Sequence, residues 1–226
     1  MKIKNLIWYW FGNELKWLWP FKVWSYFKPG IGIVTSNSRI CIEGFPRSGN
    51  TFLFAIACQL IDPEKVAHHL HHCAQIAEAL RLKVPVFFIV RNPSDAIASY
   101  VIREEIPIER AIDQYLSLYH FIEQNSQHIH ILSFETLRTD VNAVIRQLID
   151  HMNIPTETTT IDLNTVKDLV ADLDRSDQGS KDINPMKVGL PNPQRDALKA
   201  EVLTTLRTEH AEKLTECESV YEQIRR

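Results

Sequence analysis

Residues 39–60 combine a short strand-like segment, a turn with a glycine at each end and a helix-like apolar segment. The first segment, residues 39–44, is rich in β-branched residues and ends at Gly44. Residues 51–60, TFLFAIACQL, suit a helix that Asp62-Pro63 would end. A strand that enters a helix through such a turn is typical of α/β folds, so we expect this fold class.

The rest of the chain continues the alternation of strands and helices. Residues 84–90, VPVFFIV, are continuously apolar, which suits a central parallel strand covered on both faces. Asn92-Pro93 supplies a helix cap and a proline at the first helical position, so a helix should follow through about Arg103. The other expected elements are strands at 65–71 and 130–134, helices at 74–82, 108–125, 141–152 and 193–225, and a polar, mobile loop at 174–192. This order predicts a parallel sheet.

Composition limits the cell compartment and the partners. The 226 residues suit one domain with room for an appendage, and a net charge of -3 argues against a protein that coats nucleic acid. The four cysteines are scattered and form no C-x-x-C pair, so neither a disulfide framework nor a zinc site is indicated. Because no secretory signal and no apolar stretch of about 18 residues is present, we expect a cytoplasmic protein that does not cross a bilayer.

The N-terminal segment is unusually aromatic and basic. All five tryptophans lie in the first 24 residues, and residues 1–32 hold five lysines but one glutamate. Such a segment suits the headgroup level of a membrane, which would make the protein peripheral at the inner membrane face. The alternative is an aromatic strap packed across the domain's own core. Pro29, Gly30 and Gly32 place the boundary near residue 32, so residues 33–226 are expected to form the main domain.

Residues 44–51, GFPRSGNT, have the spacing of the phosphate-binding sequence G-x-x-x-x-G-K-[ST], but Asn50 stands at the lysine position. Between a strand and a helix, backbone N–H groups and the helix dipole converge on an anion, and Arg47 adds a cation. ATP hydrolysis needs the lysine and an acidic residue for Mg²⁺, yet strand 84–90 is followed by Arg91. Both departures argue against ATP and magnesium. A purely structural glycine turn is the alternative.

Two segments resemble the cofactor motifs of sulfotransferases, which use 3'-phosphoadenosine 5'-phosphosulfate (PAPS). They are residues 42–53, IEGFPRSGNTFL, and residues 91–100, RNPSDAIASY, with a weaker likeness at residues 133–138. The resemblance spans about residues 40–140. It implies a three-layer, P-loop-like α/β fold with a central parallel β-sheet flanked by helices.

The resemblance also assigns cofactor-binding residues. It implies that the 5'-phosphosulfate is bound by Arg47, Ser48, Gly49, Asn50 and Thr51. Arg91 and Ser99 match the residues that hold the 3'-phosphate, and an arginine at a strand's carboxyl end is well placed for that contact. Phe52 and Phe134 match positions that stack on or border adenine, with a core role as the alternative for each.

Residues 68–72, HHLHH, hold four of the nine histidines and stand at the end of the second expected strand. The resemblance places a catalytic base here, and we expect it to be His71, with His69 as the second candidate. A neutral imidazole is suited to accept the proton of an acceptor hydroxyl, while Arg47 would neutralise charge that develops on the sulfonate. A zinc site built from alternate histidines with Cys73, or a merely structural cluster, is the alternative.

The family's C-terminal R-K-G-x-x-G segment is matched in this chain by its final glycine alone, in residues 184–189, NPMKVG. The resemblance therefore implies a short, bacterial-type enzyme. Such an enzyme moves a sulfuryl group from PAPS to a hydroxyl of a carbohydrate, lipid or small-molecule acceptor and releases 3'-phosphoadenosine 5'-phosphate (PAP). The alternatives are a P-loop kinase that uses ATP and a non-catalytic nucleotide-binding module held at a membrane or partner by its N-terminus.

Overall fold

A parallel sheet forms the centre of the computed structural model, which describes residues 21, 23, 31–152, 154, 161–178 and 193–225. The strands are β1 (Ile40–Gly44), β2 (Val66–His68), β3 (Val86–Val90) and β4 (His130–Ser133). They pair in the order β2-β1-β3-β4, and every pairing is parallel. The carboxyl ends of all four strands therefore lie at one edge of the sheet.

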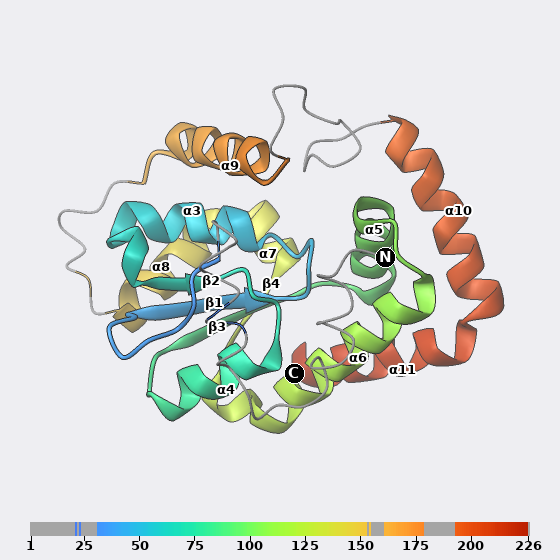
Figure 1. The fold of residues 1–226 in the computed structure, drawn as a ribbon, viewed down its shortest axis with the longest axis horizontal. Coiled ribbons are helices and arrows are strands. Elements are labelled where there is room, and N and C mark those ends of the chain that lie inside the picture. Colours follow the sequence, from blue (N-terminus) through green and yellow to red (C-terminus); the bar gives the residue numbers. More distant parts are fainter. Residues whose placement is uncertain are drawn as a thin grey trace.

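Helices cover both faces of this sheet and give the expected three layers (Figure 1). One face packs against α3 (Asn50–Leu60), α7 (Phe134–Thr139), α8 (Val141–Met152) and α9 (Leu163–Gln178). The other packs against α4 (Cys73–Arg81), α5 (Pro93–Glu104), α6 (Ile108–Asn125) and α11 (Ala211–Arg225), with α10 (Pro193–Glu209) beside α5. Short 3-10 helices, Pro63–Lys65 and Ser126–His128, precede β2 and β4. The α/β fold with a central parallel β-sheet flanked by helices is confirmed.

The two cores arise from the alternation of side chains along the strands. Ile42 and Ile89 belong to the core under α3 and α8, whereas Cys41 and Phe88 belong to the core under α4 and α6. All five residues of β3 are buried. This burial on both faces explains why its sequence is continuously apolar.

Two sequence expectations about the bounds of elements are wrong. The second strand was expected through residue 71 but ends at His68, because His69 and His71 adopt left-handed backbone angles, with φ of 62° and 56°. The polar loop was expected from residue 174, but α9 continues to Gln178. Residues 179–192, which include the partial match at 184–189, lie outside the described residues. The two helices α10 and α11 confirm the helical C-terminal stretch.

Most of the aromatic N-terminal segment lies outside the described residues, so the membrane and strap interpretations both stay predictions. Phe21, which the structure does describe, is buried beside Leu70 and Ala74, and its ring lies 4.7 Å from that of His72. None of the helices in the described part of the chain is long and apolar enough to cross a membrane.

Candidate functional site

The carboxyl edge of the sheet brings together the residues that the sequence singles out. The phosphate-loop residues 44–51 begin at the last residue of β1, the histidine cluster begins at the last residue of β2, Arg91 follows β3 and Phe134 follows β4. The chain leaves β1 for β2 on one side and later returns to β3 on the other side. Open α/β sheets bind ligands at such a point, where the strand order reverses.

The phosphate loop has the backbone that an anion cradle requires. Gly49 has a φ of 88°, and a Cβ there would lie 2.9 Å from Leu137 Cδ2 and 3.3 Å from Phe134 Cδ2. Gly49 also caps α3 and, having no side chain, makes no capping hydrogen bond to the first turn of this helix. The backbone N–H groups of this first turn therefore remain available to an anion in the loop.

Two polar side chains of this loop are buried and incompletely bonded. Ser48 Oγ and Asn50 Oδ1 are both shielded from solvent and have no hydrogen-bond partner. The Asn50 amide donates to the Phe45 carbonyl at 3.1 Å, so this side chain closes the loop from within. A buried hydroxyl without a partner is costly, and an oxygen of a bound ligand would satisfy it.

Two arginines join the phosphate loop to the segment after β3. Arg47 Nε donates to Ser99 Oγ on α5 at 3.4 Å, and Arg91 Nη1 donates to the Arg47 carbonyl. The Arg91 guanidinium lies over the Phe134 ring, 4.3 Å from its centroid. The structure thus brings Arg47, Arg91, Ser99 and Phe134 together. Phe52 is half-buried on α3, and both Phe52 and Phe134 pack against the core on that face of the sheet.

Two buried tyrosines of α6 fix the backbone of Arg91, and sequence reasoning missed both. Tyr115 Oη donates to the Arg91 carbonyl at 2.9 Å, and Tyr119 Oη accepts from the Arg91 N–H at 2.9 Å. Their rings stack with centroids 3.8 Å apart. Burial raises the pKa of both phenols, which therefore remain neutral donors. Tyrosines four residues apart on a helix with an otherwise apolar face are the signal that was available.

The histidine cluster begins at His68, the last residue of β2, and continues as a tight turn rather than as strand. Left-handed angles at His69 and His71 cost about 1–2 kcal/mol each for such residues, so other contacts must hold the turn. His69 Nε2 shares a hydrogen bond with Thr51 Oγ1 at 3.0 Å, and its Nδ1 shares a short one with His68. Both candidate bases lie beside the phosphate loop, because His71 Nδ1 lies 2.8 Å from the Gly44 carbonyl.

The zinc alternative loses its structural basis. It required alternate histidines on one face of a strand, and β2 ends before His69. In the part of the chain that the structure describes, no three His, Cys, Asp or Glu side chains are grouped as a metal site would need.

A buried carboxylate, missed by sequence reasoning, supports this turn. Glu43 is fully buried in β1 and accepts from the backbone N–H groups of Leu70 at 3.0 Å and His71 at 2.8 Å. Gln75 Nε2 donates to it at 2.8 Å. Burial raises the pKa of Glu43 to about 7, although these hydrogen bonds favour the charged form. A charged residue in the middle of an apolar strand was the available signal.

His68 is the buried, neutral member of the cluster. Its ring stacks on Phe54 with centroids 3.7 Å apart. Burial, with a smaller contribution from His71, lowers the pKa of His68 to about 3. His68 is therefore neutral in the folded protein at any ordinary pH.

We expect acid to destabilise the protein through His68. Below pH 6.5 the unfolded chain takes up a proton at this residue that the folded protein excludes, so stability falls as pH falls. The loss amounts to about 2 kcal/mol between pH 6.5 and pH 4.5. The free energy of unfolding in urea, measured for the wild type and for His68→Phe at both pH values, isolates this loss. Glu43 titrates in both proteins, so its contribution cancels in the comparison. Parallel pH dependences would contradict a neutral His68.

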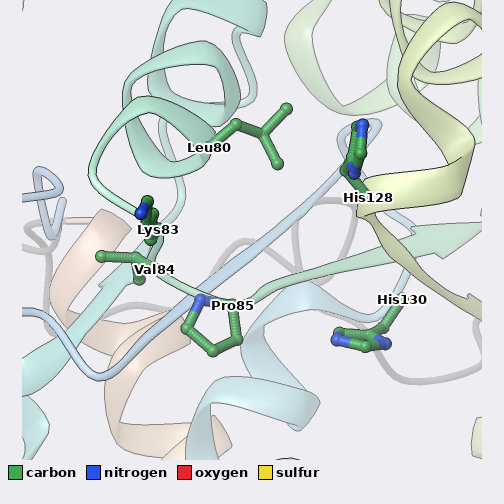
Figure 2. A pocket seen from close by; sticks show the side chains of 6 residues that line it. All are labelled: Leu80, Lys83, Val84, Pro85, His128 and His130. Atoms are coloured by element: carbon green, nitrogen blue, oxygen red, sulfur yellow. The ribbon is translucent and has the colours of Figure 1, made fainter.

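A pocket at the opposite edge of the sheet is separate from these residues (Figure 2). It is lined by Leu80, Lys83, Val84, Pro85, His128 and His130, which cluster where β3 and β4 begin. None of the residues predicted for cofactor binding lines it. The candidate site is therefore the carboxyl edge and not this pocket.

The comparisons with known proteins give a distant likeness among solved structures and none in sequence. No family model matches the chain, and no curated protein matches its sequence. Among solved structures, the fold matches that of mouse sulfotransferase SULT7A1 complexed with PAP, at 13% sequence identity and a TM-score of 0.44. The match covers 81% of this chain and 90% of that one. At this identity and TM-score the likeness carries no argument about family or activity, which must rest on the residues of this chain.

Proposed function

We propose that the chain is a sulfotransferase, which moves a sulfuryl group from PAPS to a hydroxyl of a carbohydrate, lipid or small-molecule acceptor. The observation that carries the proposal is the junction of two anion-binding elements. Arg47, in the phosphate loop, reaches Ser99, and Arg91 reaches back to the Arg47 carbonyl. A nucleotide with phosphate groups on both its 5' and 3' carbons needs two such elements side by side.

The residues present fit this cofactor. On the 5' side the phosphate loop would hold it through Ser48, Gly49, Asn50 and Thr51, and the buried Ser48 Oγ is an unsatisfied group that a ligand oxygen would satisfy. On the 3' side Arg91 and Ser99 would bind the phosphate. Phe134 lies under the Arg91 guanidinium and beside Gly49, and it would border the adenine. When bound, the cofactor supplies a sulfuryl group on a phosphate leaving group.

The histidine turn favours His71 over His69 as the base. A carbonyl oxygen can only accept, so the contact of His71 Nδ1 with the Gly44 carbonyl requires the proton on Nδ1. The lone pair of the neutral ring is then on Nε2, which can take the proton of an acceptor hydroxyl. Arg47, in the adjoining loop, can neutralise negative charge that develops during transfer.

The kinase alternative has less support. Asn50 occupies the lysine position with its amide bonded inside the loop, and β3 is followed by Arg91 rather than by an acidic residue. Asn50 lacks the cation that a lysine places on the β- and γ-phosphates, and Arg91 cannot ligate Mg²⁺.

Thermal unfolding with PAP tests the cofactor assignment. A ligand at about a hundred times its Kd adds about 2.7 kcal/mol, which raises Tm by about 5–10 °C for a chain of this size. We expect this rise in the wild type and its loss in Arg91→Ala, because the 3'-phosphate loses its bidentate partner. Arg81→Ala, an exposed arginine of α4 that pairs with Glu78, is the control and should keep the full shift. Stabilisation by magnesium-ADP or zinc instead of PAP would overturn the proposal.

A further inference from the structure

We infer that Glu43 is the positioning residue of the proposed base: its carboxylate holds the turn that aims the His71 ring and stabilises the imidazolium that forms there. This inference rests on the proposed function and deepens it. The groups proposed to bind the cofactor are other side chains and the N–H groups at the start of α3, so the role of Glu43 can be tested separately from cofactor binding.

Two consecutive residues of β1 fix both the backbone and the ring of His71. Glu43 Oε2 accepts the His71 N–H at 2.8 Å, and Glu43 Oε1 accepts the Leu70 N–H at 3.0 Å. The next carbonyl along the strand, that of Gly44, accepts the His71 ring Nδ1–H at 2.8 Å. The left-handed turn at His69 and His71 is thus tied to the strand that leads into the phosphate loop.

The carboxylate is also close enough to respond to the charge of the ring. Glu43 Oε2 lies 3.7 Å from His71 Nδ1, and the His71 side chain is 20% exposed whereas that of Glu43 is fully buried. When Nε2 takes a proton, the new positive charge lies beside a negative group in a medium of low dielectric. The arrangement parallels that of a buried aspartate that orients a catalytic histidine and stabilises its charged form.

The other groups that face Glu43 do not compete for this role. Cys41 of β1 and Cys73 of α4 interact electrostatically with it, but burial raises the pKa of both thiols and keeps them neutral. His68 of β2 is neutral as well, and the β3 residue paired with Glu43 is Phe88. From α4, the Gln75 amide donates to Oε1 at 2.8 Å and favours the ionised form. Because the pKa of Glu43 is about 7, its ionisation changes within the physiological pH range.

The pH dependence of transfer tests the inference through Gln75. Gln75→Met removes the donor to Glu43 while keeping the carboxylate and His71, so the pKa of Glu43 should rise. We expect the acid limb of the kcat profile to move up by about one pH unit, with the KM for PAPS unchanged. Glu43→Gln should lower kcat about 10–100-fold, as outer partners of metal-binding histidines do. Glu78→Gln, a half-buried residue of the same helix that pairs with Arg81, is the control and should change neither.

A measurement without turnover separates this inference from the proposed function. In ¹⁵N spectra of the imidazoles, wild-type His71 should be the Nδ1-protonated tautomer, and Glu43→Gln should give a mixture of tautomers while keeping its stabilisation by PAP. An unchanged tautomer together with an unmoved acid limb would overturn the role of Glu43 and leave the proposed function standing. Wild-type protein that is not stabilised by PAP, with the tautomer as expected, would overturn the proposed function and leave the positioning of His71 by Glu43 established.

Discussion

Replacing His71 with alanine is expected to lower the rate of transfer about 10²–10⁴-fold and to leave the stabilisation by PAP unchanged. The ring bonds to the Gly44 carbonyl through Nδ1, whereas the anion cradle is built from backbone N–H groups. The contribution of His71 to transfer is therefore the proton-accepting Nε2. Turnover can be followed with radiolabelled PAPS and a panel of hydroxyl acceptors, such as a phenol, a hexose and a monoacylglycerol. Thermal unfolding with PAP provides the binding measurement.

His69→Ala is the informative comparison, because His69 has the same side chain in the same turn. Both of its ring nitrogens are bonded within the protein, to Thr51 and to His68, so we expect a smaller loss of rate and some loss of stability. His120→Ala, on the exposed face of α6, controls for the removal of an imidazole elsewhere. Full turnover in His71→Ala with loss of turnover in His69→Ala would move the base to His69.

The elements that sequence predicted best are those whose local signals agree with their surroundings. The run VFFIV of β3 is apolar because the sheet covers it on both faces, and α5 begins at Asn92-Pro93 because Asn92 Oδ1 accepts from the Asp95 N–H. Gly49, singled out by the spacing of the loop between a strand and a helix, has the positive φ that only glycine adopts easily. Such features depend on residues near in sequence, so a single sequence contains them.

The missed features depend on contacts between distant residues or on signals that were overlooked. The left-handed turn at His69 and His71 is held by Glu43, more than twenty residues earlier, and no local pattern encodes it. The short helix α7 is different, because Ser133 Oγ caps it through the Glu135 N–H at 3.2 Å. The helix α9 also had a signal, since Val166, Leu169, Val170 and Leu173 have helical spacing and pack on the core.

Gly49→Ala is expected to destabilise the protein by about 2–4 kcal/mol and to abolish the stabilisation by PAP. The left-handed φ of 88° costs about 1–2 kcal/mol for alanine, and the contact of its Cβ with Leu137 at 2.9 Å adds about 1–3 kcal/mol. Alanine also restricts the unfolded chain, which offsets less than about 1 kcal/mol of this destabilisation. Relief of the clash must shift Leu137 and Phe134 or the loop itself. Urea unfolding measures the first effect, and the shift in Tm with PAP measures the second.

A double-mutant cycle with Leu137→Ala separates the clash from the backbone strain. Leu137→Ala alone removes a buried side chain and should cost about 2–5 kcal/mol. In the double variant the cost of Gly49→Ala should fall to the backbone part, about 1–2 kcal/mol, because the alanine Cβ then has room on the Leu137 side. Strictly additive costs would show that the steric contact with Leu137 is not what excludes a side chain at this position. The φ of residue 49 aims the first N–H groups of α3 into the loop. If Gly49→Ala displaces the loop itself, the double variant should still show no shift in Tm with PAP. If the clash with Leu137 is the sole cause, the double variant should regain that shift.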